Sequence, residues 1–232
     1  MTRPGHAFPR AGARPAATRT QVLALLALVA LAASCGKDDS PTAPAPTPAE
    51  LVAGGWSQFE RGAYAGAQGD FEAALAQDAA YGPAHLGRAW SLLVRAGAAA
   101  DYETAEAAFD SAMAHQETSA AVWAGRAAAR LGRGGDALAG AATDAEQAIA
   151  RDPAFSFAHL AGFDAADARL MLAQARAGLG DFAGALVAVQ PDCPIDLRPD
   201  DPAGWTVAGT SYDSYASAVL AWLQQTGAIV AP

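Results

Sequence analysis

The chain has 232 residues, of which 52% are hydrophobic and 17% are charged, so it can bury a substantial core. One compact domain with appended segments is expected for this length and composition. Its 15 basic and 24 acidic residues give a net charge of −9 at pH 7, and a surface of that sign repels phosphate backbones. We therefore expect no nucleic-acid partner.

Residues 1–34 have the composition of a secretory signal peptide. They include four arginines and no acidic residue, followed by an apolar run from Val22 to Ala33 that ends in small residues. This run is too short to span a bilayer as a helix of the mature protein. An uncleaved anchor or a disordered leader is the alternative. Removal of residues 1–34 leaves 11 basic against 24 acidic residues, a net charge of −13.

The stretch LAASC, residues 31–35, resembles the end of a bacterial lipoprotein signal, in which cleavage precedes the cysteine and the sulfur receives lipid. The resemblance implies that Cys35 is lipidated and anchors the chain to a membrane of the bacterial cell envelope. Ala32 departs from the family pattern, which usually has a large aliphatic residue there. Gly36 follows the cysteine, and in this family the absence of aspartate at that position favours the outer membrane. A disulfide between Cys35 and Cys193 is the alternative, because exported proteins often pair their cysteines.

Residues 35–50 contain four prolines in the stretch GKDDSPTAPAPTPA. Such a segment is extended and semi-rigid, and it lacks apolar side chains that could pack. We expect it to be a tether between the anchor and a folded domain.

Residues 51–190 contain an alanine-rich repeat. The stretches GAYAGAQGDFEAALAQD, ADYETAEAAFDSAMAHQ and GAATDAEQAIARDP align at steps of 38 and 36 residues, and a fourth copy starts at GDFAGA with Phe182 and Ala185. The aligned small residues are Ala67, Ala105 and Ala141, then Ala74, Ala112 and Ala148. A further helical stretch precedes each copy. In the alignment of the first two copies, Tyr64 matches Tyr102 and Phe71 matches Phe109. The third copy lacks these aromatic residues.

This pattern resembles the tetratricopeptide repeat (TPR), in which small residues lie where two helices touch and aromatic residues fill the gaps between them. The resemblance implies an all-α solenoid of three to four helical hairpins, with small residues at Gly55, Gly87 and Gly125 for close helix approach. Independently, alanine is the strongest helix former, and alternating β-branched residues are missing from 51–189, which argues against a sheet. Glycines at 62, 97, 132 and 180 are predicted at helix C-termini, and Asp101 and Asp181 at N-caps.

Residues 191–232 break the repeat. The stretch QPDCPIDLRPDDPAGW has four prolines and is predicted to be a loop. After it, apolar residues recur at helical spacing, namely Tyr215, Val219, Trp222 and Leu223. Because a repeat stack exposes an apolar end, we expect this helix to cap the stack.

Catalytic and metal-binding motifs are missing from the sequence, including H-E-x-x-H, the Walker loop, G-x-S-x-G and C-x-x-C. The stretch GRGGDA, residues 132–137, matches a dinucleotide fingerprint by letters, but helix and not strand precedes it, so an inter-helix turn is predicted. We expect no enzymatic activity, cofactor or metal. The alternative is an envelope solute-binding protein or enzyme that uses the loop 190–205 as its site.

The TPR resemblance implies that the first helix of each pair lines a groove that holds a peptide segment of a protein partner. The positions that it places near the groove are Trp56, His85, Arg88, Trp123, Arg126, Arg130, Asp167 and Gln174. Arg126 and Arg130 are four residues apart, and Arg88 corresponds to Arg126 one repeat earlier. Since arginine binds carboxylates bidentately, we predict that the three bind an acidic or C-terminal segment. The alternative is that they pair with the protein's own Asp and Glu side chains.

Overall fold

The computed structural model describes residues 44–193 and 195–226. The signal-like segment 1–34, Cys35 and most of the predicted tether lie outside the described residues. The first helix begins at Pro48, two residues before the predicted end of the tether. Proline is favoured at this first helical position, and Thr47 and Glu50 close a reciprocal capping box around the helix start.

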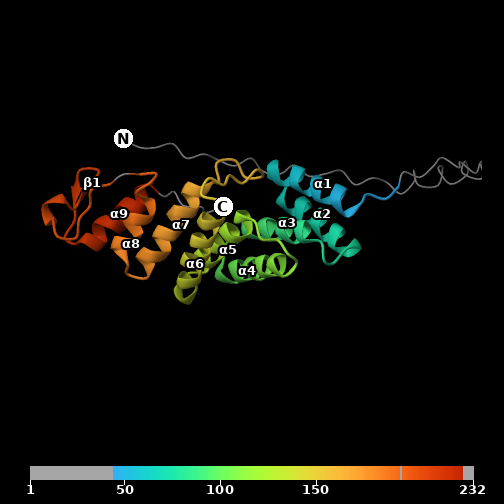
Figure 1. The fold of residues 1–232 in the computed structure, drawn as a ribbon, viewed down its shortest axis with the longest axis horizontal. Coiled ribbons are helices and arrows are strands. Elements are labelled where there is room, and N and C mark those ends of the chain that lie inside the picture. The colour runs from blue at the N-terminus through green and yellow to red at the C-terminus, as the bar shows by residue number, and fades with distance from the viewer. Residues whose placement is uncertain (1–43, 194, 227–232) are drawn as a thin grey trace, which may run out of the picture. The chain divides into compact units, whose positions relative to one another are not determined.

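Four consecutive helix pairs build the described part of the chain (Figure 1). The first helices of the pairs are α1 (Pro48–Glu60), α3 (Gly82–Leu93), α5 (Ala120–Arg133) and α7 (Ala165–Gly178). The second helices are α2 (Tyr64–Gln77), α4 (Ala99–Ala114), α6 (Leu138–Arg151) and α8 (Phe182–Val189). Each helix packs mainly against the helices before and after it in sequence. The predicted all-α arrangement of TPR-like hairpins is confirmed.

Glycine and phenylalanine fit together between neighbouring helices. A Cβ atom built on Gly55 would lie 2.7 Å from Cε1 of Phe71, and one built on Gly87 would lie 2.3 Å from the same atom. One aromatic ring of α2 therefore fills the space between α1 and α3, and both positions must lack a side chain. Gly125 and Phe109 repeat the arrangement between α5 and α4, at 2.3 Å. The predicted role of these glycines is confirmed.

The predicted helix ends are correct at some positions and wrong at others. Gly62 and Gly180 have φ of 77° and 85° just beyond α1 and α7, and the Asp181 side chain caps α8 at Gly184 N–H. Gly132 is wrongly placed, because it lies inside α5 with Tyr102 packed against it, and Gly134 ends the helix at φ 70°.

Two further end signals are shifted along the chain. Gly97 lies within the α3–α4 connection, beyond the C-cap of α3 at Val94. Asp101 lies inside the first turn of α4, where its carboxylate accepts hydrogen bonds from the N–H groups of Gly97 and Ala98. Its charge therefore still satisfies the start of the helix, from a position three residues beyond the N-cap.

The inter-helix turn predicted in the stretch 132–137 is found at residues 134–137, because Gly132 and Arg133 still belong to α5. Gly134 and Gly135 both have positive φ, and the short 3₁₀ helix η1 (Gly135–Ala137) leads into α6. No strand precedes it among the described residues, and the segment before it is α5.

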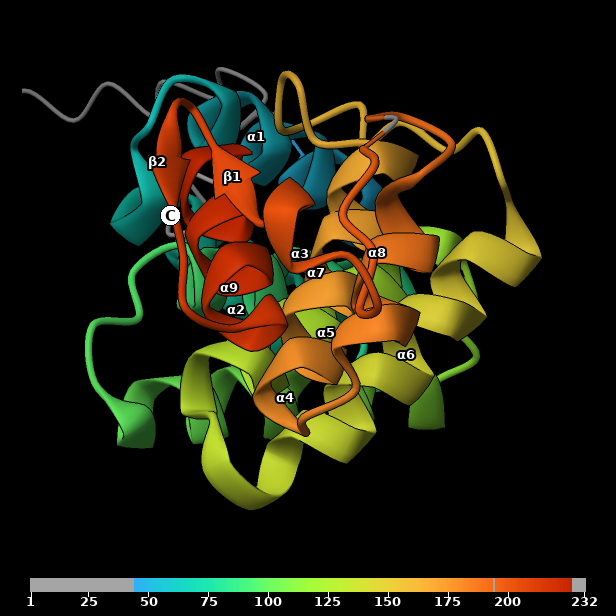
Figure 2. The same ribbon diagram turned by 90° about the vertical axis from the view of Figure 1, so that its left-hand side faces the viewer.

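The C-terminal part closes the stack. After the loop and the 3₁₀ helix η2 (Pro202–Gly204), a short hairpin pairs β1 (Thr206–Val207) with β2 (Thr210–Ser211), and α9 (Tyr215–Thr226) follows. The hairpin was not predicted. Helix α9 packs against α7, α8 and β1, with Val219 and Leu223 buried (Figure 2). The predicted capping helix is confirmed.

Candidate partner-binding site

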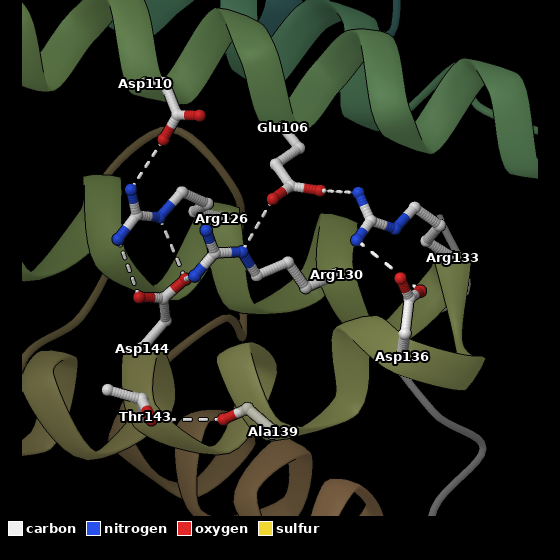
Figure 3. Close-up of polar contacts among 9 residues, drawn as sticks. All are labelled: Glu106, Asp110, Arg126, Arg130, Arg133, Asp136, Ala139, Thr143 and Asp144. Carbon is white, nitrogen blue, oxygen red and sulfur yellow. Dashed lines mark hydrogen bonds and ion pairs between the residues drawn. The ribbon is translucent and has the colours of Figure 1, made fainter.

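An ion-pair network lies between α5 and the two second helices beside it (Figure 3). The guanidinium of Arg126 binds both carboxylate oxygens of Asp144, with Nε to Oδ2 at 2.9 Å and Nη2 to Oδ1 at 2.8 Å. Its Nη1 also donates to Asp110 at 2.6 Å. Arg130 donates to Asp144 from Nη1 at 2.7 Å and to Glu106 from Nε at 2.8 Å. Two of the predicted partner-binding arginines are thus occupied within the chain.

Asp144 is the buried centre of this network, because its side chain is only 1% exposed. It lies beside Ala145 in the third repeat copy, where Ala145 occupies the place of Phe71 and Phe109. The network also includes Arg133, which donates to the second oxygen of Glu106 at 2.6 Å. Burial opposes the charge of Arg126, but the hydrogen bonds that Arg126 donates to Asp144 and Asp110 outweigh it and raise the pKa of Arg126. Arg126 and Arg130 thus pair with Asp and Glu side chains of the same chain, which is the alternative given in the sequence analysis.

Arg88 differs from Arg126 although it holds the same place in the preceding repeat. The residue 36 positions before Asp144 is Ala108, so the second repeat has no buried carboxylate at this point. Among residues 44–193 and 195–226, no acidic side chain forms an ion pair with Arg88, and its Nε is buried without a hydrogen-bond partner. Of the three predicted arginines, Arg88 is the one without an acidic partner within the described residues.

His85 lies one helical turn before Arg88 and stacks on His115, with ring centroids 4.2 Å apart. Its Nε2 is 2.9 Å from the Ala79 carbonyl oxygen, while its Nδ1 is buried without a partner. Burial lowers the pKa of His85 against the raising effect of the Ala79 hydrogen bond, and the nearby His115 and Arg88 lower it further. The imidazole is therefore kept neutral at pH 7.

Trp123 corresponds to His85 one repeat later and is also covered by the chain itself. The guanidinium carbons of Arg126 and Arg151 lie 4.9 Å and 4.2 Å from its ring centroid. Such cation–π contacts stabilise the ring in place. Trp123 is thus part of the packing between α5 and α6.

Asp167 and Gln174 both lie on α7, but they contact different parts of the structure. Asp167 accepts a hydrogen bond from Asp164 N–H at 2.8 Å at the helix start, and burial raises its pKa. Gln174 borders a pocket of about 180 Å³ where α7 meets Leu220 and Leu223 of α9. Asp167 and Gln174 therefore have separate local surroundings on α7.

Trp56 is covered by a segment of the same chain, a contact that the sequence analysis did not predict. Residues 152–164, which connect α6 to α7, fold back over the face of α1 and α3; Figure 1 shows this segment in yellow-orange beside α1. We call residues 152–164 the return loop, and Trp56 with Trp90 the tryptophan face. His159 stacks on Trp56 with ring centroids 4.0 Å apart, and its Nδ1 lies 2.8 Å from Oε1 of Glu60.

Phenylalanines of the return loop complete the contact. Phe157 stacks on Trp90 at 4.4 Å between centroids and meets Trp56 edge-on at 5.7 Å. Phe163 meets Trp90 edge-on at 5.2 Å. The available sequence signal was a run of three phenylalanines, at 155, 157 and 163, inside an inserted connection.

The alternative site at the loop 190–205 has a small pocket at its start. This pocket of about 200 Å³ is lined by Ala166, Asp167, Leu170, Val189, Asp192, Cys193 and Trp222. Asp192 is held by Arg169, with Nη2 to Oδ1 at 2.6 Å. Ligand pockets for small molecules usually measure 300 to 1,000 Å³, so this one is small for a solute site. Within the described residues, no three His, Cys, Asp or Glu side chains cluster as metal ligands.

No protein-family model matches the sequence, and no curated protein matches it. Among solved structures, the chain is similar to a thermophilic TPR protein from Thermus thermophilus. The identity is 17% and the TM-score 0.47, over 65% of this chain and 76% of that chain. The TPR-like assignment therefore rests on the helix pairs and their glycine–aromatic contacts. In the part of the chain that the structure describes, no helix has the length and apolar character needed to cross a bilayer.

Proposed function

We propose that this protein is a non-enzymatic scaffold of the bacterial cell envelope that holds a segment of a partner protein against its first helices. The observation that supports this best is the return loop on the tryptophan face. A polypeptide segment remote in sequence is held there by side-chain stacking and one polar contact, across 99 residues between His159 and Glu60. A surface that holds one such segment has the chemistry to hold another.

The direct test is site-specific photo-crosslinking in intact cells. A photoreactive residue at Ala53, which is exposed on α1 at helical spacing from Trp56 and Glu60, should crosslink a discrete partner protein. The matched control is the same residue at Val187, which is 63% exposed on the last second helix. Crosslinks at neither position, or identical crosslinks at both, would contradict a scaffold that works through its first helices.

The proposed anchor is a lipid on Cys35, with the outer membrane favoured because Gly36 follows it. Acyl chains contribute about 0.8 kcal/mol per buried methylene, so two or three chains hold a protein firmly at a membrane. Mass spectrometry of the mature N-terminus tests this proposal. A chain that begins at lipid-modified Cys35 is the expected result, and an unmodified chain that begins elsewhere would exclude the lipoprotein assignment.

The proposed acidic or C-terminal partner segment now depends on Arg88. Arg126 and Arg130 are held by Asp144, Asp110 and Glu106, so their charge is already balanced. If a partner carboxylate binds here, Arg88→Ala should weaken partner binding more than Arg130→Ala does. Equal effects of the two substitutions would argue against an acidic partner segment.

A further inference from the structure

We infer that the tryptophan face is a binding site for an extended, aromatic-rich partner segment that carries a basic side chain, and that the return loop is a built-in competitor for this site. This inference rests on the proposed scaffold function and names the chemistry of its partner.

The return loop is much longer than the other connections. It spans residues 152–164, whereas the connections after α1, α2, α3, α4 and α7 have three to five residues. Lengthening a surface connection adds little loop-closure free energy, so the insertion is tolerated, but a turn between α6 and α7 does not need it. The extra residues are used to reach α1 and α3.

Aromatic anchors and one polar contact hold the loop in place. Phe157 touches both tryptophans, and His159 covers Trp56 while its Nδ1 contacts Glu60. Rigid aromatic side chains in desolvated contacts provide most of the binding energy in peptide recognition. The loop thus places on the tryptophan face the aromatic rings and the polar contact that a bound peptide would place there.

The neighbouring helices have direct contacts of their own, although Phe155, Phe157 and Phe163 of the loop are buried in the same core. Helices α6 and α7 pack directly, with Gly178 of α7 close against Leu138 of α6. The loop also has its own backbone hydrogen bonds, from Phe157 N–H to Phe163 O at 2.9 Å and from Leu160 N–H to Phe157 O at 3.2 Å. Release of the loop therefore breaks its contacts with the tryptophan face and these few internal hydrogen bonds, and it leaves the direct contact between α6 and α7 in place.

The face defines the competing segment. Two large apolar rings, Trp56 and Trp90, require aromatic side chains in exchange for Phe157 and Phe163. The carboxylate of Glu60, which His159 contacts through Nδ1, is complemented by a basic side chain in the same place. Because the loop is tethered, its effective concentration is high, and only a partner with several such anchors displaces it.

The test uses the full chain and a synthetic peptide with the sequence of residues 153–164. In the double variant Phe157→Ala/His159→Ala the loop loses its anchors, so the peptide should bind about tenfold more tightly than it binds the parent, as followed by tryptophan fluorescence. A peptide with Phe157→Ala should bind the double variant about tenfold more weakly. The matched control protein carries Ala161→Ser, an exposed change in the same loop, and should behave like the parent. Equal binding by parent, control and double variant, or no binding by a double variant of parental helicity, would overturn the inference.

Hydrogen exchange of the unmodified protein gives a second test that does not depend on the variant. The amides of Phe157, Leu160 and Phe163 should exchange about 100-fold faster than the buried amides of α3 and α5, because the loop opens without global unfolding. Exchange of these amides only with global unfolding would show that the loop is a permanent part of the core and would overturn the inference.

The two proposals fail in different ways. If the double variant crosslinks the same partner with the same yield as the parent, the scaffold function stands and the competition by the loop is wrong. If peptide binding behaves as expected but cells yield no crosslinked partner, the site stands as a peptide-binding surface and the envelope function fails.

Discussion

At Asp144, a carboxylate with a 1% exposed side chain accepts three hydrogen bonds from two guanidinium groups. An ion pair of this kind does not by itself make a protein stable, because both charges lose their hydration. Its partners become interdependent, however, since the removal of one leaves the other buried and unpaired. Asp144 is the partner that Arg126 and Arg130 share, beside Asp110 for Arg126 and Glu106 for Arg130.

Replacement of Asp144 by alanine should therefore be strongly destabilising. The loss removes the shared partner of two half-buried arginines, and we expect the free energy of unfolding to fall by about 3 to 5 kcal/mol. Urea denaturation followed by circular dichroism measures it. Asp136→Ala is the matched control, because that carboxylate is 95% exposed and 3.8 Å from Arg133, and it should change stability by about 0 to 1 kcal/mol. A loss below about 1 kcal/mol for Asp144→Ala would contradict this account of the network.

His85 gives the protein a pH-dependent stability. Its pKa is lowered in the folded state by burial, so the unfolded state binds the proton more readily. The stabilising effect of the neutral ring is present above the unfolded-state pKa of about 6.5 and is lost as the pH falls through and below that value. We expect the melting temperature to fall between about pH 7.5 and about pH 5.5.

The contribution of His85 can be isolated by substitution. A His85→Gln variant should show a smaller decrease of melting temperature over the same pH range, because the site no longer titrates. An unchanged pH dependence in this variant would assign the effect to other groups.

At the scale of the elements, glycine–aromatic contacts set the distance between helices. Phe71 lies against Gly55 and Gly87, and Phe109 lies against Gly125. Elsewhere a helical glycine only weakens a helix, because alanine is the better helix former by about 1 kcal/mol. The contact overrides that preference at these three positions.

Gly125→Ala should destabilise the protein by about 1 to 3 kcal/mol, since the new Cβ would lie 2.3 Å from the Phe109 ring. Gly69→Ala is the matched control, because that glycine lies within α2 and no atom surrounds its Cβ position within 4 Å. The control should stabilise the chain by about 0.5 to 1 kcal/mol. Thermal denaturation of the two variants should thus give shifts of opposite sign, and shifts of the same sign would refute the role of the contact.

For the whole domain, the described helices form a stack in which most contacts join neighbours. Stability in such an array is a sum of repeat and interface terms, so damage at one end affects the nearest repeat most. Helix α9 packs against the last pair, α7 and α8, and strand β1 packs against α9, with Val207, Val219 and Leu223 buried.

Leu223→Ala should cost about 2 to 5 kcal/mol, because this side chain of the capping helix is only 4% exposed. Leu220→Ala, one turn away on the same helix at 43% exposure, should cost about 1 kcal/mol or less. Hydrogen exchange should locate the damage of Leu223→Ala at α7 and α8, with α1 and α2 little changed. Uniform loss of protection along the chain would show that the domain unfolds as one cooperative unit.

The sequence alone determined the helical hairpins, their repeat and their cap. These depend on local features, namely alanine content, the 36- to 38-residue spacing of small residues and turn glycines, and each feature acts through neighbours in the chain. Even so, the sequence predicted a helix end at Gly132, whereas this glycine lies inside the helix and packs against Tyr102. The sequence alone does not distinguish a glycine needed for close packing from one needed for a turn.

Only the tertiary structure decided the candidate site. Arg88 and Arg126 hold equivalent places in the repeat, yet Arg126 binds Asp144 and Arg88 has Ala108 at the equivalent position, a difference that lies on another helix. The contact of His159 with Trp56 and Glu60 joins segments about a hundred residues apart, and no periodicity in the sequence encodes it. Local pattern fixes helices because their hydrogen bonds are local, whereas the pairing of side chains from remote segments depends on the path of the whole chain.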